Sequence, residues 1–339
     1  MLDRNGIICH YEFMNKLENA KRGMIVRAVC EGNSLRATSR MTWVAYNTVC
    51  KLIQDLGEAC NWYQDKHLVN LPCKELQLDE AWAFVGCKEE NKKHAHGHGD
   101  IWTWVGICAQ TKLVAGWYVG DRSARTAVDF CNDLGDRFSG HLQVTSDGHA
   151  AYRFAVGIGF RDVDYAQLVK IYGQDADGKE VVIRCDKVPR IGNPDPDKIN
   201  TSFVERQNLT LRMSLRRYAR RTNAHSKKVE NHCKAVALHF FSYNFMRKHL
   251  TLKTSPAVAA GVTDKIWTAD DLLAMFDAYQ SENHPVNRPP RYKSRRSFPK
   301  TSPPQAPKLP WYLDPNSGGA PSEGSEDGDG EDEDPQISN

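Results

Sequence analysis

The pattern of residues 74–147 constrains the fold of this chain most. Apolar and β-branched residues fill the runs 76–85, 101–107 and 113–119, and the short interval between the last two predicts a β-hairpin. Residues 123–138 have apolar side chains on one helical face, and residues 142–146 predict a fourth strand. Three strands, a helix, a strand and further helices predict an α/β domain with a mixed sheet flanked by helices.

The remainder of the chain is predicted to be mostly helical and then irregular. Residues 160–165 predict a short strand, and 173–200 are loop-like with a hairpin strand at VVIRC. Helices are expected over 201–221, 227–250 and 270–278. Eleven of the sixteen prolines lie between residues 285 and 335, where a Pro-rich basic stretch precedes an acidic one. Neither stretch can bury enough apolar surface to offset chain entropy, so we expect a disordered C-terminal tail.

The charge of the chain is unevenly distributed. Its 339 residues have a formal net charge of +3, but residues 315–339 contain eight acidic residues and neither Lys nor Arg. Residues 1–314 therefore carry +11, which indicates a polyanionic partner, most often nucleic acid. No apolar run approaches the roughly 20 residues that cross a bilayer, and the N-terminus lacks a signal-peptide pattern. We expect a cytoplasmic, DNA-associated protein without a membrane partner.

Residues 18–60 predict three helices arranged as a helix-turn-helix. Ser34 can cap the short helix SLRATSR, Met41 and Thr42 form a tight turn, and Thr42 can cap a third helix beginning at Trp43. The N-terminal residues of such a recognition helix meet base edges in the major groove. A plain three-helix bundle is the alternative. We predict DNA contacts by residues at this turn: Arg36, Arg40, Thr42, Trp43, Tyr46 and Asn47.

Three acidic residues stand at positions suited to a metal site. Asp79 lies inside the first predicted strand, Asp147 ends the fourth, and Glu205 lies in the first turn of the helix that starts near residue 201. Converging carboxylates repel one another unless a divalent cation keeps them ionised, and oxygen ligands suit Mg²⁺ or Mn²⁺. Taken singly, each acid also fits a structural role. Their order along the chain favours two ions clamping a phosphoryl displacement.

The helix that contains Glu205 is rich in arginine. Arg212 follows Glu205 by seven residues, which is two turns along the same face. Residues 206–221 contain no acid, and the planar guanidinium grips phosphate bidentately. We predict that this segment contacts DNA through five further arginines: Arg206, Arg216, Arg217, Arg220 and Arg221.

Four runs of the sequence resemble the transposases of the insertion-sequence-one family. They are CKELQLDEAWAFVG (73–86), LQVTSDGHAAY (142–152), NTSFVERQNLTLRMSLRRYARRT (200–222) and KTSPAVAAGVTDKIWTADDLL (253–273). The resemblance implies a ribonuclease-H-like core of the Asp-Asp-Glu type, with Asp79, Asp147 and Glu205 as the catalytic triad and Arg212 as its basic companion. The family often has a zinc-finger-like element, but no C-x-x-C pair occurs here.

These observations predict a Mg²⁺-dependent DNA transposase that binds element ends, cuts their 3′ ends and joins them to target DNA. The resemblance further implies a homo-oligomer on DNA. We expect a helix-turn-helix region over 1–70, a catalytic domain over 71–280 and the tail over 281–339. The alternatives are a helix-turn-helix regulator without catalysis, a metal-dependent nuclease without strand transfer, and an inactive relic. The run HAHGHGD (94–100) is either a metal site or an ordinary loop.

Overall fold

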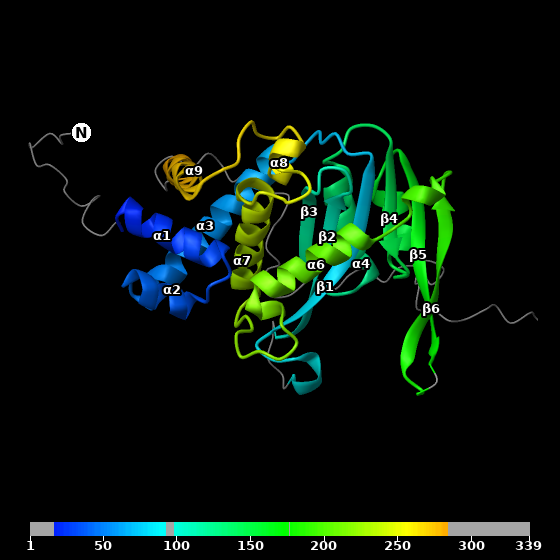
Figure 1. The fold of residues 1–339 in the computed structure, drawn as a ribbon, viewed down its shortest axis with the longest axis horizontal. Coiled ribbons are helices and arrows are strands. Elements are labelled where there is room, and N and C mark those ends of the chain that lie inside the picture. Colours follow the sequence, from blue (N-terminus) through cyan, green and yellow to red (C-terminus); the bar gives the residue numbers. More distant parts are fainter. Residues whose placement is uncertain (1–16, 93–97, 176, 284–339) are drawn as a thin grey trace, which may run out of the picture. The chain divides into compact units, whose positions relative to one another are not determined.

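A six-stranded mixed sheet forms the centre of the computed structural model, which describes residues 17–92, 98–175 and 177–283 (Figure 1). These residues belong to one compact unit, Met1–Gln305. The sheet order is β3-β2-β1-β4-β5-β6. β1, β4 and β5 are parallel, whereas β2, β3 and β6 run antiparallel to their neighbours. The strands are β1 (Glu75–Val85), β2 (Gly99–Cys108), β3 (Val114–Gly120), β4 (Leu142–Asp147), β5 (Val163–Gln174) and β6 (Glu180–Ile191).

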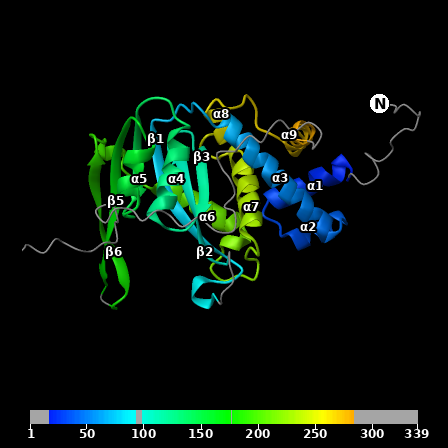
Figure 2. The same cartoon turned by 180° about the vertical axis from the view of Figure 1, so that it is seen from behind.

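Helices cover both faces of the sheet. On one face, Leu134 of α4 lies against Gly106 of β2, and α5 packs beside α4 (Figure 2). On the other face, the backbone N–H of Phe203 in α6 donates to Gln77 of β1, and Phe240 of α7 packs on the indole of a β3 tryptophan. The mixed α/β fold predicted from the sequence is confirmed. The bounds of these helices are α4 (Ala124–Gly135), α5 (Tyr152–Gly159), α6 (Ser202–Ser214) and α7 (Val229–Phe241).

The N-terminal helices pack against α7 and against α9, which comes from the far end of the described chain. α3 runs along α7, and Gly57 allows the approach because a Cβ there would lie 2.2 Å from the Lys234 carbonyl oxygen. Arg22 of α1 forms an ion pair with Asp277 of α9 at 2.8 Å. The bounds are α1 (Asn19–Cys30), α2 (Leu35–Thr42), α3 (Tyr46–His67), α8 (Pro256–Ala259), α9 (Ala269–Glu282) and four shorter turns, η2 (Glu89–Asn91), η3 (Pro196–Lys198), η4 (Arg216–Tyr218) and η5 (Ser242–Met246).

The turn between α2 and α3 lies three residues later than predicted. Ser34 caps α2 as expected, because its hydroxyl accepts the N–H of Ala37. Thr42, however, ends α2 instead of capping α3: its side chain is buried and donates to the carbonyl oxygen of Thr38. Trp43 then adopts a left-handed backbone with φ of 55°, and α3 begins at Tyr46. The prediction that Thr42 caps the third helix is therefore wrong.

Three further predictions of secondary structure are corrected. The helix expected over 201–221 ends at Ser214, where Leu215 turns to an extended backbone and η4 follows. The region 173–200, expected to be mainly loop, contains the end of β5 and all of β6, which form a long hairpin. α5 was not predicted. None of the described helices is both long and apolar enough to span a membrane. Residues 281 and 282 of the predicted tail belong to α9, whereas 284–339 of that tail and 94–97 of the histidine run lie outside the described residues.

Candidate active site

The three predicted acids converge on one pocket at the carboxyl end of β4, where β4 lies beside β1. The parallel register pairs Leu78 with Ser146, which places Asp79 and Asp147 next to each other on the face that α6 covers. Glu205 reaches the same place from the first turn of α6. The pocket has a volume of about 490 Å³, and Arg212 also lines it. Residues separated by as many as 133 positions along the chain thus share one cavity.

Asp79 is a half-buried acid held by the helix that covers it. Its Oδ2 accepts a hydrogen bond of 2.9 Å from the Nδ2 of Asn208, which lies one turn after Glu205 on α6. Burial, together with the charge of Asp147, raises the pKa of Asp79 to about 6. The carboxylate therefore lies in an environment that opposes its negative charge, unless a cation shares the pocket.

Glu80 is a fourth carboxylate at this site, and the sequence interpretation missed it. Carboxylate oxygens of Asp79, Glu80 and Asp147 all lie within 4.8 Å of one another. Burial and the charge of Asp147 raise the pKa of Glu80 to about 8, although Arg122 forms an ion pair with its Oε2 at 3.3 Å. The hydroxyl of Tyr152 also interacts with this buried carboxylate and opposes the rise in its pKa. The adjacent pair Asp79-Glu80 in one strand is the signal that marks this position.

Glu205 lies outside that cluster of three carboxylates, although it lines the same pocket. Its Oε1 accepts from the Nζ of Lys170 in β5 at 2.7 Å and from the hydroxyl of Thr201 at 3.0 Å. Lys170 lines the pocket as well, and its pKa is raised by the bond to Glu205. The pocket thus combines the carboxylates of Asp79, Asp147 and Glu205 with two cations, Lys170 and Arg212, while Glu80 lies beside it. Such a set can hold a divalent ion and a phosphate at once.

The other predicted DNA contacts separate into exposed and internal groups. Arg206 on α6 and Arg216, Arg220 and Arg221 at and after η4 are exposed. Arg217 instead points inward, and its Nη1 donates to Ser226 and to the carbonyl oxygen of Asn231. Because α6 ends at Ser214, the last four of these arginines do not lie on its helical face.

Near the helix-turn-helix sequence, the exposed residues gather around the turn after α2. Trp43 is 91% exposed, and the guanidinium of Arg36 lies 5.1 Å from the centre of the Tyr46 ring. Arg40 and Asn47 are also exposed. Thr42 is the exception, because its side chain is buried. The turn therefore presents one large aromatic side chain flanked by cations.

Two comparisons place the chain among known proteins. Residues 195–247, which include Glu205, Asn208 and Arg212, match the family model described as IS1 transposase. The insertion element iso-IS1n protein InsB of Shigella dysenteriae is 29% identical over 174 residues, covering 51% of this chain and 95% of that protein. The chain is similar to IS1 transposases over these segments. The family resemblance drawn from the sequence is thereby confirmed.

The IS1 match and the acidic pocket meet on one element. The matched segment contains α6, which provides Glu205 and Arg212, while Asp79 and Asp147 belong to strands that lie before it in the sequence. IS1 transposases are transposition proteins of insertion sequences, so the relationship supports a transposase. It suggests an enzyme that cleaves and joins DNA, with the three-carboxylate cluster as a candidate metal site.

Proposed function

We propose that this chain is a DNA transposase that binds the ends of its element, cuts their 3′ ends and joins them to target DNA. The observation that carries the proposal is the meeting of Asp79, Asp147, Glu205 and Arg212 in one pocket of an IS1 relative. The strand order β3-β2-β1-β4-β5, with three antiparallel strands followed by parallel ones, supports a ribonuclease-H-like core. On this proposal, residues 71–280 form the catalytic domain.

The donor set of the pocket fits divalent ions that prefer oxygen. Asp79, Glu80 and Asp147 offer oxygens close enough to share a ligand. We propose Asp79, Asp147 and Glu205 as the residues that hold two Mg²⁺ ions, with Mn²⁺ as a substitute. When bound, such ions lower the pKa of water or of a 3′-hydroxyl and neutralise charge on the phosphodiester.

The remaining pocket residues position the acids and the DNA strand. Asn208 fixes the carboxylate of Asp79 through its amide N–H, so α6 orients a side chain of β1. Lys170 holds Glu205 at the mouth of the pocket and must release it when Glu205 turns toward the other acids. Arg212 and Lys170 then supply the positive charge that grips the non-bridging oxygens of a phosphodiester.

The turn after α2 is proposed to recognise the terminal repeats of the element. Trp43, Tyr46 and Asn47 are exposed at the start of α3, and Arg36 and Arg40 flank them. Such a surface suits contacts with base edges and with the neighbouring phosphates. On this proposal residues 1–70 form the DNA-recognition region of a cytoplasmic, DNA-associated protein that acts as a homo-oligomer on DNA.

The substitution Glu205→Gln tests the assignment of the active site. Glutamine keeps the size of the side chain but removes the charge that holds a cation, so we expect 3′-end cleavage to fall by at least about a hundredfold. Gel-shift binding of the terminal DNA should persist. Glu282→Gln, an exposed change on α9, is the matched control and should leave both measurements unchanged.

Three outcomes would contradict parts of the proposal. Full Mg²⁺-dependent cleavage by the Glu205→Gln variant would remove Glu205 from the active site. Cleavage by the unaltered protein without joining of a 3′-hydroxyl donor to plasmid DNA would identify a nuclease instead of a transposase. Sequence-specific binding with no cleavage at all would identify a DNA-binding regulator.

A further inference from the structure

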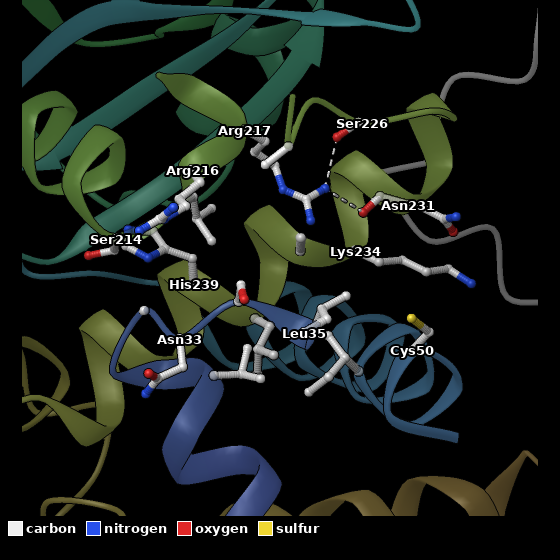
Figure 3. Close-up of a pocket in the computed structure, with 18 of the residues that line it drawn as sticks. Asn33, Leu35, Cys50, Ser214, Arg216, Arg217, Ser226, Asn231, Lys234 and His239 are labelled. Carbon is white, nitrogen blue, oxygen red and sulfur yellow. Dashed lines mark hydrogen bonds between the residues drawn. The ribbon is translucent and has the colours of Figure 1, made fainter. Parts of the chain in front are cut away.

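A second, larger cavity lies between the N-terminal helices and the segment that follows α6 (Figure 3). Its volume is about 680 Å³, within the range of about 300–1,000 Å³ found for small-molecule sites. α2 and the start of α3 form one wall, and η4, residues 222–227 and α7 form the others. It shares no lining residue with the acidic pocket, so it is a separate site.

Two adjacent arginines give this cavity a positive end. Arg216 and Arg217 both extend from η4 into it, with Arg217 at the centre in Figure 3. In the described part of the chain, no carboxylate forms an ion pair with either guanidinium. Burial lowers the pKa of Arg217, because an enclosed cation is costly without a counter-charge. An anionic ligand would supply the charge that the protein itself does not provide.

Arg217 is held in place by a chain of buried hydrogen bonds. Its Nη1 donates to the Ser226 hydroxyl at 2.8 Å, and that hydroxyl lies 3.0 Å from the Nδ1 of His232. The Nε2 of His232 lies 2.8 Å from the Tyr218 hydroxyl, which lies 2.6 Å from the hydroxyl of Thr103 in β2. The guanidinium is therefore fixed to the central sheet before any ligand arrives, which reduces the entropy lost on binding.

The cavity also has apolar lining residues and, beside Arg216 in Figure 3, His239 with an unpartnered ring nitrogen. Leu35, Ile53 and Leu238 line it. The Nε2 of His239 is buried and has no hydrogen-bond partner among the described residues. Lys234 also lines the cavity, but it forms ion pairs with the two glutamates Glu58 and Glu230, so its charge is already balanced. The ligand must therefore combine an anionic group with a flat or apolar body that offers a hydrogen bond.

We propose that this cavity binds a nucleoside monophosphate, with the phosphate on Arg216 and Arg217 and the base against the apolar wall beside His239. Inorganic phosphate satisfies only the arginines, and a nucleoside satisfies only the apolar wall. The nucleotide comes either from solution or from a DNA strand whose base leaves the stack, since both present the same chemistry. The inference goes beyond the proposed function, because it requires no acidic residue of the other pocket.

The first experiment measures binding of 2′-deoxyadenosine 5′-monophosphate to the full-length protein by calorimetry. We expect tighter binding than for 2′-deoxyadenosine or inorganic phosphate alone. Arg216→Gln should weaken it by at least about tenfold, because a charge-assisted hydrogen bond to phosphate is lost. Arg216 is exposed and its side chain has no hydrogen-bond or ion-pair partner in the described ranges, so this variant should fold. Arg161→Gln, the same charge change on an exposed loop, should bind normally.

The second experiment separates the two sources of the nucleotide. A short DNA strand and its duplex each carry one 2-aminopurine, whose fluorescence changes when the base leaves the stack. An extruded DNA base is supported if the fluorescence changes on binding, Arg216→Gln abolishes the change, and the free monophosphate competes with it. Binding of the monophosphate without any such change supports a free nucleotide. Absence of both signals, or equal losses in Arg216→Gln and Arg161→Gln, overturns the proposal. The variant Glu205→Gln should retain both signals, so failure here is distinct from failure at the acidic pocket.

Discussion

Glu80 belongs to the acidic site although its side chain points to the face of β1 opposite to that of Asp79. Neighbouring residues of a strand point to opposite faces, so Asp79 faces α6 while Glu80 faces Arg122. Asp147 lies at the end of β4, where its carboxylate comes close to both of them. Because its pKa is raised to about 8, Glu80 adds negative charge to the proposed metal site only when a bound cation keeps it ionised, and it pairs with Arg122 beside the site.

The substitution Glu80→Gln should weaken the use of Mg²⁺ without unfolding the protein. The amide can still accept from Arg122, but it adds no charge near Asp79 and Asp147. We expect the Mg²⁺ concentration needed for half-maximal end cleavage to rise by about 10–100-fold, the range for residues that support metal ligands. Titration of cleavage with Mg²⁺ checks this. The control is Asp129→Asn, a change at an exposed residue of α4. An unchanged Mg²⁺ requirement would leave Glu80 with only its structural ion pair.

The triad could be predicted from the sequence because each acid has a recognisable local position. Asp79 is inside an apolar strand, Asp147 ends a strand, and Glu205 opens a helix, and all three positions are as expected. Glu80 and Asn208 could not be found in this way. Their roles depend on which strand ends and which helix turns face each other, and only the register of β1 with β4 and the placement of α6 determine that.

Among the elements, the packing of α3 on α7 depends on one small residue. A Cβ at Gly57 would lie 2.2 Å from a backbone oxygen of α7, which cannot move away as a flexible side chain can. Gly57→Ala should therefore lower the free energy of unfolding by about 1–3 kcal/mol or more. Gly23→Ala in α1 is the control: its Cβ would meet only side-chain atoms at 3.5 Å and beyond, so stability should be equal or slightly higher. Urea unfolding midpoints measure both, and equal midpoints for the two variants would contradict the close approach.

His141 connects the start of β4 to the start of β5 and makes this contact sensitive to pH. Its two ring nitrogens lie 2.8 Å from Asp162 and from Asp164, and these bonds raise the pKa of His141 above its ordinary 6.5. The protonated form is therefore favoured in the folded state. Its contribution to stability is complete below pH 6.5 and is lost as the pH rises through the raised folded value.

Thermal melting of the unaltered protein and of His141→Gln should show this dependence. The unaltered protein should melt at the higher temperature in mildly acidic buffer, and the difference should shrink as the pH becomes alkaline. The effect is small because the side chain is exposed. A difference that stays constant with pH would mean that the imidazole charge does not contribute.

The elements that were predicted wrongly are those whose ends depend on tertiary contacts. Arginine favours helix, so residues 201–221 read as one helix, but the chain breaks at Leu215 and η4 buries Tyr218 against Thr103 and His232. Only the VVIRC part of the β5–β6 hairpin was predicted, because the rest of its strands is polar and half-exposed. Its turn is built locally, with the Asp175 carboxylate accepting two backbone N–H groups. Contacts with distant parts of the chain, which a single segment does not reveal, decided both.

At the scale of the whole molecule, distant parts of the chain close around the proposed recognition helices. α9 meets α1 through the Arg22–Asp277 pair, 255 positions apart, and α7 packs along α3. The division at residue 70 stays a prediction. A domain that ended there would leave out α9, although α9 packs on α1 and α3. The nucleotide cavity also draws its walls from both sides of that boundary.

The separation of charge along the chain gives a last prediction about the whole protein. Residues 1–314 carry a formal +11, and the acidic residues of 323–334 reduce it to +3. Replacing those eight acids with Asn and Gln in the full-length chain should tighten binding to non-specific DNA by up to about tenfold at low salt, because long-range attraction increases. The gain should fade as added salt screens the charges. Fluorescence anisotropy across a salt series measures this change in affinity.

The control is a chain with the same residues 315–339 in scrambled order, which keeps the charge and should bind like the unaltered protein. If scrambling tightens binding as much as neutralisation does, a specific contact of the acidic segment, and not net charge, controls access to DNA.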